Sequence, residues 1–149
     1  MAFEPFAGHR YTKVTDQRTQ VDGAHFSKEL VEHYSPHVEN IRLVMDNLHP
    51  HPTATLYEAF DPPEAKRIAE KLAVHYTPKH GSWLNMAEIE LSHLSRQCLR
   101  GHIVAKAPLI KKVQAWNGER NERHTQAHWQ FTTDDARVKL SRLYPMVST

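Results

Sequence analysis

The sequence has only one cysteine, Cys98, among its 149 residues. A disulfide within the chain is therefore excluded, and a cytoplasmic location is the default expectation. Long hydrophobic runs are also missing, since no apolar stretch approaches the roughly 20 residues that span a bilayer. Residues 1–5 show neither the basic nor the apolar region of a secretory signal peptide. We therefore expect neither a membrane-spanning helix nor a signal peptide.

A large excess of charge of one sign is missing as well. The formal net charge is +2, and 24% of the residues are charged and 40% hydrophobic, as is usual for a soluble globular protein. A chain of this length can form one domain with a core. Because the net charge is small, bulk charge does not by itself indicate nucleic-acid binding, and any contact with DNA has to come from local clusters.

Hydrophobic periodicity and turn residues predict alternating strands and helices. We expect strands at 10–14, 41–45 and 73–76, and the apolar strand 41–45 should be buried on both faces. Prolines at positions 50 and 52 predict irregular structure for several residues after that strand. We expect a first helix that ends near residue 34, capped by Asp22 or Ser27, and further helices over 61–72, over 85–99, from Pro108 and from Thr133. This order predicts an α/β fold.

Asp46 directly follows the predicted strand 41–45. In open α/β sheets, ligands gather beyond the carboxyl ends of the strands, so this carboxylate is a candidate binding group. A turn formed by Asp46 and Asn47 accounts for the same position without any ligand. The position alone leaves both interpretations open.

The helix predicted from Asn85 supplies further carboxylates. Its core-facing stripe consists of Ala87, Leu91, Leu94 and Cys98. Glu88 and Glu90 lie on opposite borders of this stripe, and periodicity does not choose between them. Two solvated glutamates are the simpler interpretation. One of them could nevertheless share a divalent cation with Asp46, because Mg²⁺ prefers oxygen ligands and needs only one or two carboxylates.

Six segments together resemble a known family. They are residues 43–47 (LVMDN), 56–60 (LYEAF), 75–90 (HYTPKHGSWLNMAEIE), 94–99 (LSRQCL), 131–137 (FTTDDAR) and 143–145 (LYP). Their sequences are similar to those of the DDE transposases of the mariner superfamily, in its bacterial insertion-sequence branch. The likeness covers nearly the whole chain, and the block 75–90 is long and specific.

The resemblance implies one partial catalytic domain over 1–149. Residues 1–104 would form a ribonuclease H-like mixed sheet flanked by helices, and residues 105–149 a C-terminal helical extension. It also implies metal-dependent DNA cleavage and strand transfer with Mg²⁺, for which Mn²⁺ can substitute. Asp46 is then the second catalytic carboxylate. Glu88, in the pattern Asn85-Met86-Ala87-Glu88, is the third, and both are expected to bind the metal.

The first carboxylate of the family's triad has no counterpart in this sequence. In the family it ends a strand upstream of the segment that resembles residues 3–14, and neither Asp16 nor Asp22 follows an apolar strand. We therefore expect a C-terminal portion of the catalytic domain that lacks its first strand, exposes a sheet edge and is inactive or nearly so alone. An upstream transposase half from an overlapping frame, or a second transposase chain, would supply the group. A decayed copy fits equally well.

The alternative function is that of a non-catalytic fragment. Such a fragment would associate with DNA or dimerise, and in this way modulate an intact transposase.

Transposon ends and target DNA are the partners that the resemblance implies, in the bacterial cytoplasm and at the nucleoid. The candidate DNA contacts are Lys79, His80, Trp83 and Asn85. Lys79 would contact phosphate, and Trp83 would stack on or wedge between bases. A Trp83 side chain folded onto the core is an equally simple interpretation. Asn47 and His49 are candidates for the rim of the site.

Overall fold

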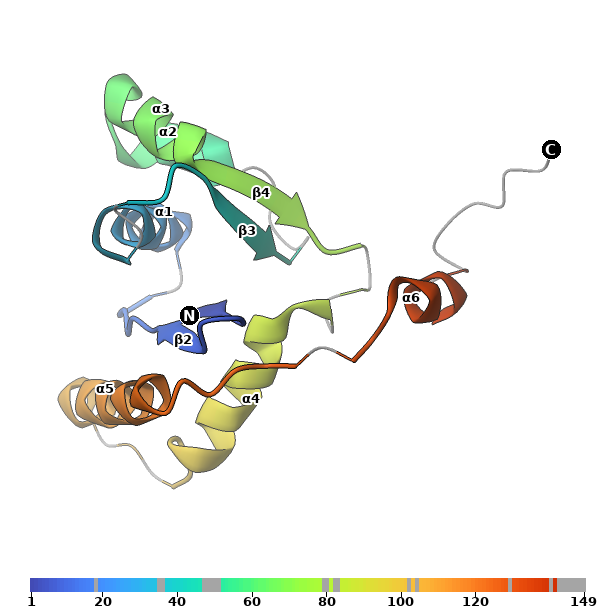
Figure 1. Cartoon of the computed structure of the whole chain (residues 1–149). Coiled ribbons are helices and arrows are strands. Elements are labelled where there is room, and N and C mark those ends of the chain that lie inside the picture. The colour runs from blue at the N-terminus through green and yellow to red at the C-terminus, as the bar shows by residue number, and fades with distance from the viewer. Residues whose placement is uncertain are drawn as a thin grey trace.

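The computed structural model has a mixed α/β fold (Figure 1). It describes residues 1–17, 19–34, 37–46, 52–78, 81, 84–101, 103, 105–128, 130–139 and 141, with the backbone alone at Tyr34 and Pro52. The elements in chain order are β1 (Ala2–Glu4), β2 (His9–Tyr11), α1 (Gln20–Glu29), the π-helical turn η1 (Leu30–Tyr34), β3 (Ile41–Met45), α2 (Pro52–Ala59), α3 (Pro62–Lys71), β4 (Leu72–Tyr76), α4 (Met86–Gln97), α5 (Lys106–Glu122) and α6 (Thr133–Lys139). The predicted α/β class is confirmed, and the arrangement is consistent with the ribonuclease H-like fold.

The strands form two small sheets, each of two strands within the described ranges. β1 and β2 form an antiparallel hairpin, whereas β3 and β4 are parallel neighbours, with Met45 beside Tyr76 at their ends. Both parallel strands therefore stop at the same place. The residues that follow them, Asp46 and Thr77, emerge side by side at one edge of the sheet.

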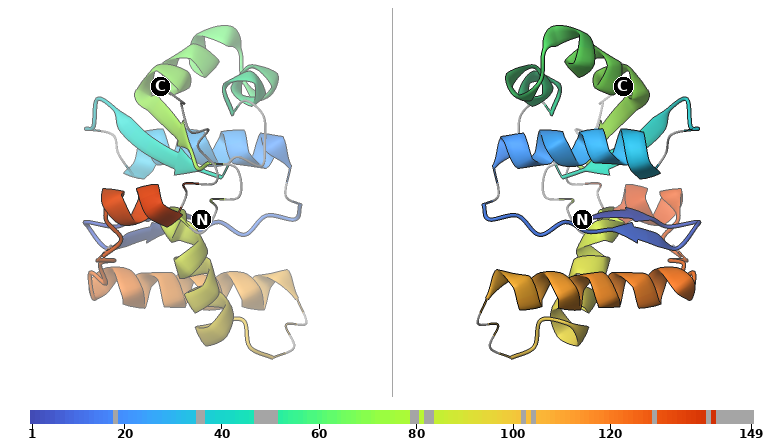
Figure 2. Two further views of the ribbon diagram at one scale, coloured as in Figure 1. Left: turned by 90° about the vertical axis from the view of Figure 1, so that its right-hand side faces the viewer. Right: turned by 90° about the vertical axis from the view of Figure 1, so that its left-hand side faces the viewer.

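Two hydrophobic clusters hold the elements together. The first lies among α1, η1, α2 and α3 and consists of Ala24, Val31, Leu56, Ala65 and Ile68, with residues of β3 and β4 packed against it. The second joins α4 to α5 and consists of Leu94, Val113 and Trp116, with Met1 and Val14 packed against it. Figure 2 shows the resulting layers, in which the β1–β2 hairpin lies between the α1 layer and α5. The chain starts in the second cluster, builds the first and then returns to the second.

The N-terminal region is a hairpin rather than the single strand predicted over 10–14. Gly8 makes its turn possible: it has a φ of 67°, which favours glycine, and its N–H donates to Glu4 O at 2.9 Å. A Cβ atom at Gly8 would lie 2.6 Å from the carbonyl carbon of His124, so the hairpin also approaches the end of α5 closely. The pairing was missed because a three-residue strand carries too little alternation to be recognised.

Thr19 caps α1, so the prediction of Asp22 or Ser27 as the cap was wrong. The Thr19 hydroxyl accepts from the N–H of Asp22 at 3.1 Å, and the Asp22 carboxylate accepts from the N–H of Thr19 at 2.9 Å. This reciprocal pair is a capping box, here with Asp in the place that Glu or Gln usually takes. Ser27 lies inside the helix and donates to Gly23 O.

Helix α2 was not predicted. Irregular structure was expected after strand 41–45 because of two prolines, but Pro52 is the first residue of α2. Proline is tolerated there, since the first helical N–H has no partner within the helix. Residues 49–51, on which the rest of that prediction falls, lie outside the described residues.

Strand β3 has the predicted bounds but not the predicted burial. Its side chains alternate between half-buried and exposed, and Val44 is 49% exposed. Ile41, on the half-buried face, packs against the first cluster. The expectation of burial on both faces was wrong, because among the described residues the first cluster packs against the half-buried face of this two-stranded sheet and leaves Val44 on the other face exposed.

The described helices are short or polar. α5, with 17 residues, carries lysine, arginine and glutamate along its length. Within the part of the chain that the structure describes, no helix combines the length and the apolar character that crossing a bilayer requires.

Replacing Ile68 by alanine is expected to lower the free energy of unfolding by about 2–5 kcal/mol, because Ile68 is completely buried in the first cluster. Urea denaturation measures this change. Val138→Ala is the control, since that side chain is 78% exposed and its truncation should change stability by no more than about 0.5 kcal/mol. Equal effects of the two substitutions would contradict the assignment of the core.

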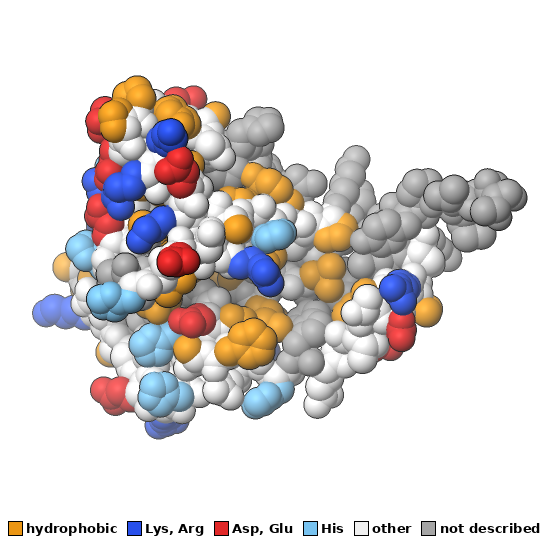
Figure 3. Space-filling view, turned by 45° about the horizontal axis from the view of Figure 1, so that its top comes forward, with side chains coloured by type: hydrophobic (Ala, Val, Ile, Leu, Met, Phe, Trp, Pro, Cys, Tyr) orange, Lys and Arg blue, Asp and Glu red, His pale blue; other side chains and the backbone are white. Residues whose placement is uncertain are grey.

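Lys28 on α1, Glu32 on η1, and Glu64 and Arg67 on α3 form a cluster of ion pairs. This charged cluster predicts that the stability of the fold depends on pH. Figure 3 shows acidic and basic side chains interleaved over this face. Hydrogen bonds from Arg67 and Lys28 lower the pKa of Glu64 from 4.5 to about 2. Because the folded-state pKa is depressed, the stabilisation from Glu64 is present above pH 4.5 and is lost as the pH falls towards about 2.

The Glu64→Gln variant should therefore lose less stability than the wild type over this window. Thermal unfolding followed at several pH values between about 2 and 7 measures the difference. Glu70→Gln, which removes an exposed carboxylate on the same helix, should follow the wild type. A Glu64→Gln curve parallel to that of the wild type would refute the prediction.

Candidate functional site

Asp46 stands at the carboxyl end of the parallel strand pair. The N–H of Thr77 donates to Met45 O at 2.9 Å, which extends the contact between the two strands one residue past the end of β4. Asp46 is half-buried in this position, so its carboxylate is anchored to the sheet and still reaches the surface. The structure confirms that this residue follows β3 directly.

Asn85 links Asp46 to helix α4. Asn85 is the N-cap of α4, and its side-chain Oδ1 accepts from the N–H of Ala87 at 3.0 Å. The other end of the same amide, Nδ2, donates to Asp46 Oδ1 at 3.1 Å. The Thr77 hydroxyl contributes a longer bond to the same carboxylate oxygen, at 3.5 Å. The beginning of α4 is therefore bonded to the end of β3.

Glu88 lies in the first turn of α4, next to this junction. Its backbone N–H donates to Asn85 O at 3.0 Å, and its side chain is exposed. A carboxylate in the first turn interacts favourably with the positive end of the helix dipole. Asp46 and Glu88 are thus both tied to Asn85, the first by the side chain and the second by the backbone. Their binding of a common metal remains a prediction.

The donor set at the junction fits a hard divalent cation in part. Carboxylate oxygens are the ligands that Mg²⁺ prefers, and the ion usually keeps several waters when only one or two carboxylates hold it. Among the described residues, no group of three or more His, Cys, Asp or Glu side chains is placed to hold a metal. The junction therefore offers two carboxylates, which suits a site completed by phosphate and other groups.

Most of the predicted DNA contacts lie outside the described residues: Lys79, His80, Trp83 and the rim candidates Asn47 and His49. Asn85 is described, and both polar atoms of its side chain are bonded within the chain. A direct contact between the Asn85 side chain and DNA would have to share or replace one of these bonds.

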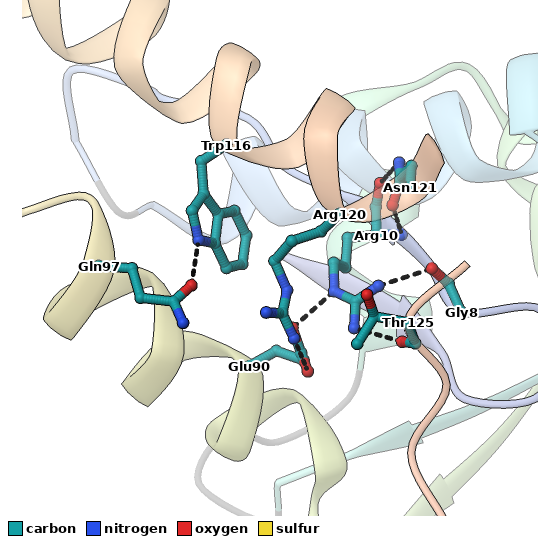
Figure 4. A network of polar contacts seen from close by, with 8 residues as sticks. All are labelled: Gly8, Arg10, Glu90, Gln97, Trp116, Arg120, Asn121 and Thr125. Atoms are coloured by element: carbon teal, nitrogen blue, oxygen red, sulfur yellow. Dashed lines mark hydrogen bonds and ion pairs between the residues drawn. The ribbon is translucent and has the colours of Figure 1, made fainter. Parts of the chain in front are cut away.

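Glu90, the alternative to Glu88 in the sequence, is buried in an ion-pair network (Figure 4). Its Oε2 accepts from Arg10 Nε at 2.5 Å, and its Oε1 accepts from Arg120 Nη2 at 3.2 Å. Arg10 is completely buried, and its two remaining donor groups bond to the carbonyl oxygens of Gly8 and Thr125, each at 2.6 Å. The interpretation of Glu90 as a solvated helix glutamate was therefore wrong.

The charge state of Glu90 follows from this environment. Burial raises the pKa of the carboxyl, but the hydrogen bond and charge of Arg10 and the charge of Arg120 lower it more, so that the net shift is downward. Periodicity gave no clear signal for this role, because Glu90 lies only on the border of the apolar stripe and its partners Arg10 and Arg120 are 80 and 30 positions away.

Two further contacts fix α4 and the hairpin. The side-chain amide of Asn121, on α5, exchanges hydrogen bonds with the backbone N–H and C=O of Arg10, at 2.8 and 2.9 Å. At the end of α4, the indole N–H of Trp116 donates to Gln97 Oε1 at 2.9 Å. Helix α4 is thus held at its start by Asn85, in its middle by Glu90 and at its last residue by Gln97.

A family model described as "DDE superfamily endonuclease" matches residues 1–110, which is about three quarters of the chain. No curated protein and no solved structure shows a significant match. The matched range includes Asp46, Asn85 and Glu88, the three residues of the junction between β3 and α4.

Replacing Glu90 by alanine is expected to lower the free energy of unfolding by about 3–5 kcal/mol, because it leaves the charge of Arg10 buried without a partner. Urea denaturation measures the loss. The matched control is Glu88→Ala, two positions earlier on the same helix, where the side chain is exposed and the change should stay within about 0.5 kcal/mol. If the two variants were equally stable, Glu90 would not anchor α4.

Proposed function

The chain belongs to the DDE superfamily of endonucleases, and on this premise we propose that it is a transposase catalytic segment for DNA cleavage and strand transfer. The observation that carries the proposal is the bond from Asn85 to Asp46, because it draws the carboxylate at the end of β3 to the first turn of the helix that bears Glu88. Asp46 and Glu88 are the proposed catalytic residues and metal ligands. The mariner superfamily and its bacterial insertion-sequence branch are the proposed position within the family.

The proposed cofactor is Mg²⁺, with Mn²⁺ as a substitute. Oxygen ligands from two carboxylates on separate elements suit these ions. Bound there, the metal would supply Lewis-acid chemistry to the attacking and leaving oxygens of a phosphodiester. The chain's own contribution is to hold two acidic groups at a surface-exposed junction, where a DNA backbone can approach them.

The proposed DNA contacts lie between Asp46 and Asn85 in the sequence. Lys79 would contact a phosphate, Trp83 would stack on or wedge between bases, and His80 is a further candidate DNA contact. Asn47 follows Asp46 directly, His49 lies two positions further on, and both are proposed for the rim. The proposal keeps residues 1–104 as the ribonuclease H-like part and residues 105–149 as a helical extension. Transposon ends and target DNA are the proposed partners.

The first carboxylate of the triad is proposed to come from another polypeptide segment. Both described candidates in the N-terminal region have other roles, since Asp22 belongs to the Thr19 capping box and Asp16 pairs with Lys106 at 2.5 Å. In the described structure β3 pairs with β4 alone, so one edge of β3 is available to a further strand. An upstream transposase half or a second transposase chain is the proposed source, and the isolated chain is expected to be inactive or nearly so.

Metal binding by the 149-residue chain tests the proposal. Mn²⁺ titrations followed by the relaxation of solvent water should give an affinity that falls at least about tenfold in Asp46→Asn and in Glu88→Gln, since each variant removes a charged ligand. Glu70→Gln, which removes an exposed carboxylate on α3, should bind as the wild type does. Unchanged binding in both site variants would refute the proposed site.

DNA nicking tests the need for an additional carboxylate. With Mn²⁺ and supercoiled plasmid, the isolated chain is expected to nick no faster than the Asp46→Asn variant. Nicking that is readily measured in the wild type and abolished in Asp46→Asn would mean that these residues suffice, and the proposed outside contribution would then be wrong.

A further inference from the structure

The Asn85 side chain is bonded at both ends of its amide group. Oδ1 accepts from the N–H of Ala87 at 3.0 Å, and Nδ2 donates to Asp46 Oδ1 at 3.1 Å. Asparagine is one of the preferred helix N-caps, and its planar amide also carries donors that serine, threonine and aspartate cannot extend in the same direction. An aspartate would cap the helix equally well but would present a second carboxylate to Asp46. Asn85 can therefore cap α4 and bond to Asp46 at the same time.

We propose that Asn85 positions the Asp46 carboxylate for metal binding, and is a positioning residue rather than a direct DNA contact. This inference rests on the proposed function, because it assigns a partner to Asp46 within the same site. Asn85 sets the orientation of the carboxylate through a neutral donor, which adds no positive charge to repel a cation.

The hydrogen bonds to Asp46 leave one of its oxygens for a ligand. The bonds from Asn85 and Thr77 both end on Oδ1, and no side chain or backbone group among the described residues donates to Oδ2. Thr77 is buried, and its backbone is bonded to Met45, so it is a fixed neighbour of the carboxylate. With Oδ1 held from two directions, the carboxylate plane is restrained, and Oδ2 keeps its lone pairs for a ligand.

Asn85 also couples this oxygen to the second carboxylate. The backbone C=O of Asn85 accepts from the N–H of Glu88, so the first turn that carries Glu88 begins at the residue that holds Asp46. The rest of α4 cannot shift freely to compensate, because Glu90 is bonded to Arg10 and Arg120 (Figure 4). The separation of the two carboxylates therefore depends on the Asn85 amide.

Three substitutions separate positioning from helix capping. Asn85→Ser retains an N-cap oxygen but lacks the arm that reaches Asp46, Asn85→Asp retains the cap and places like charges together, and Asn85→Ala removes both contacts. The readouts are the Mn²⁺ affinity of the full chain and the urea midpoint with and without Mn²⁺. Asp46→Asn is measured in parallel.

Asn85→Ser is expected to lower Mn²⁺ affinity by about 10–100-fold, the usual effect of removing a group that orients a metal ligand, and to keep a urea midpoint close to that of the wild type. Asn85→Asp should have a lower midpoint than the wild type without metal, because the new carboxylate faces Asp46. Added Mn²⁺ should raise that midpoint more than it raises the wild-type midpoint, since the cation screens the repulsion.

The outcomes distinguish the possible roles. If Asp46→Asn weakens Mn²⁺ binding and Asn85→Ser does not, the positioning role is wrong and the proposed function stands. If Asn85→Ser instead weakens binding to DNA in the presence of EDTA with Mn²⁺ affinity unchanged, Asn85 is a DNA contact and the inference is overturned. If the wild type binds no Mn²⁺, or if Asp46→Asn binds it as the wild type does, the proposed site fails and the inference fails with it.

Discussion

The position of α4 depends on one buried carboxylate. Glu90 joins the N-terminal hairpin to α5 through Arg10 and Arg120, and Arg10 has no contact with solvent. A buried ion pair needs further hydrogen bonds to offset the loss of water, and here the carbonyl groups of Gly8 and Thr125 bond the two other nitrogens of the Arg10 guanidinium, whereas Arg120 Nε is buried without a partner among the described residues. Because these buried groups cannot exchange their bonds for bonds to water, the network fixes the position of α4. The residues at the start of the helix are therefore fixed as well.

The candidate site follows from that restraint. The first cluster positions β3 and β4, the second positions α4, and the two meet where Asp46 accepts a hydrogen bond from Asn85. A site between two separately packed units can be precise only if both units are rigid where they meet. The Glu90 network and the Asn85 amide provide this rigidity. The described donors to Asp46, from Asn85 and Thr77, are both neutral.

The sequence allowed prediction of the elements next to the site, although not of the hairpin or of α2, because the patterns that mark them are local. The bounds of β3, the start of α4 at its N-cap Asn85 and the proximity of Asp46 to a strand end all follow from hydrophobic patterns and turn residues. The Arg10–Glu90 pair could not be predicted in this way, since its partners are 80 positions apart and periodicity reports only neighbours within a turn or two. The choice of Glu88 over Glu90 came from the family resemblance, and the structure supplies a physical reason why Glu90 is occupied elsewhere.

The network also sets an order of events for a chain that is being made on the ribosome. The first cluster draws on residues 24–68 and can assemble early, because its members emerge together. Arg10 and Glu90 acquire their full set of partners only after Arg120 and Thr125 have left the exit tunnel. Until translation has passed that point, the Glu90 network does not yet restrain α4, and the start of the helix is held by the bond from Asn85 to Asp46.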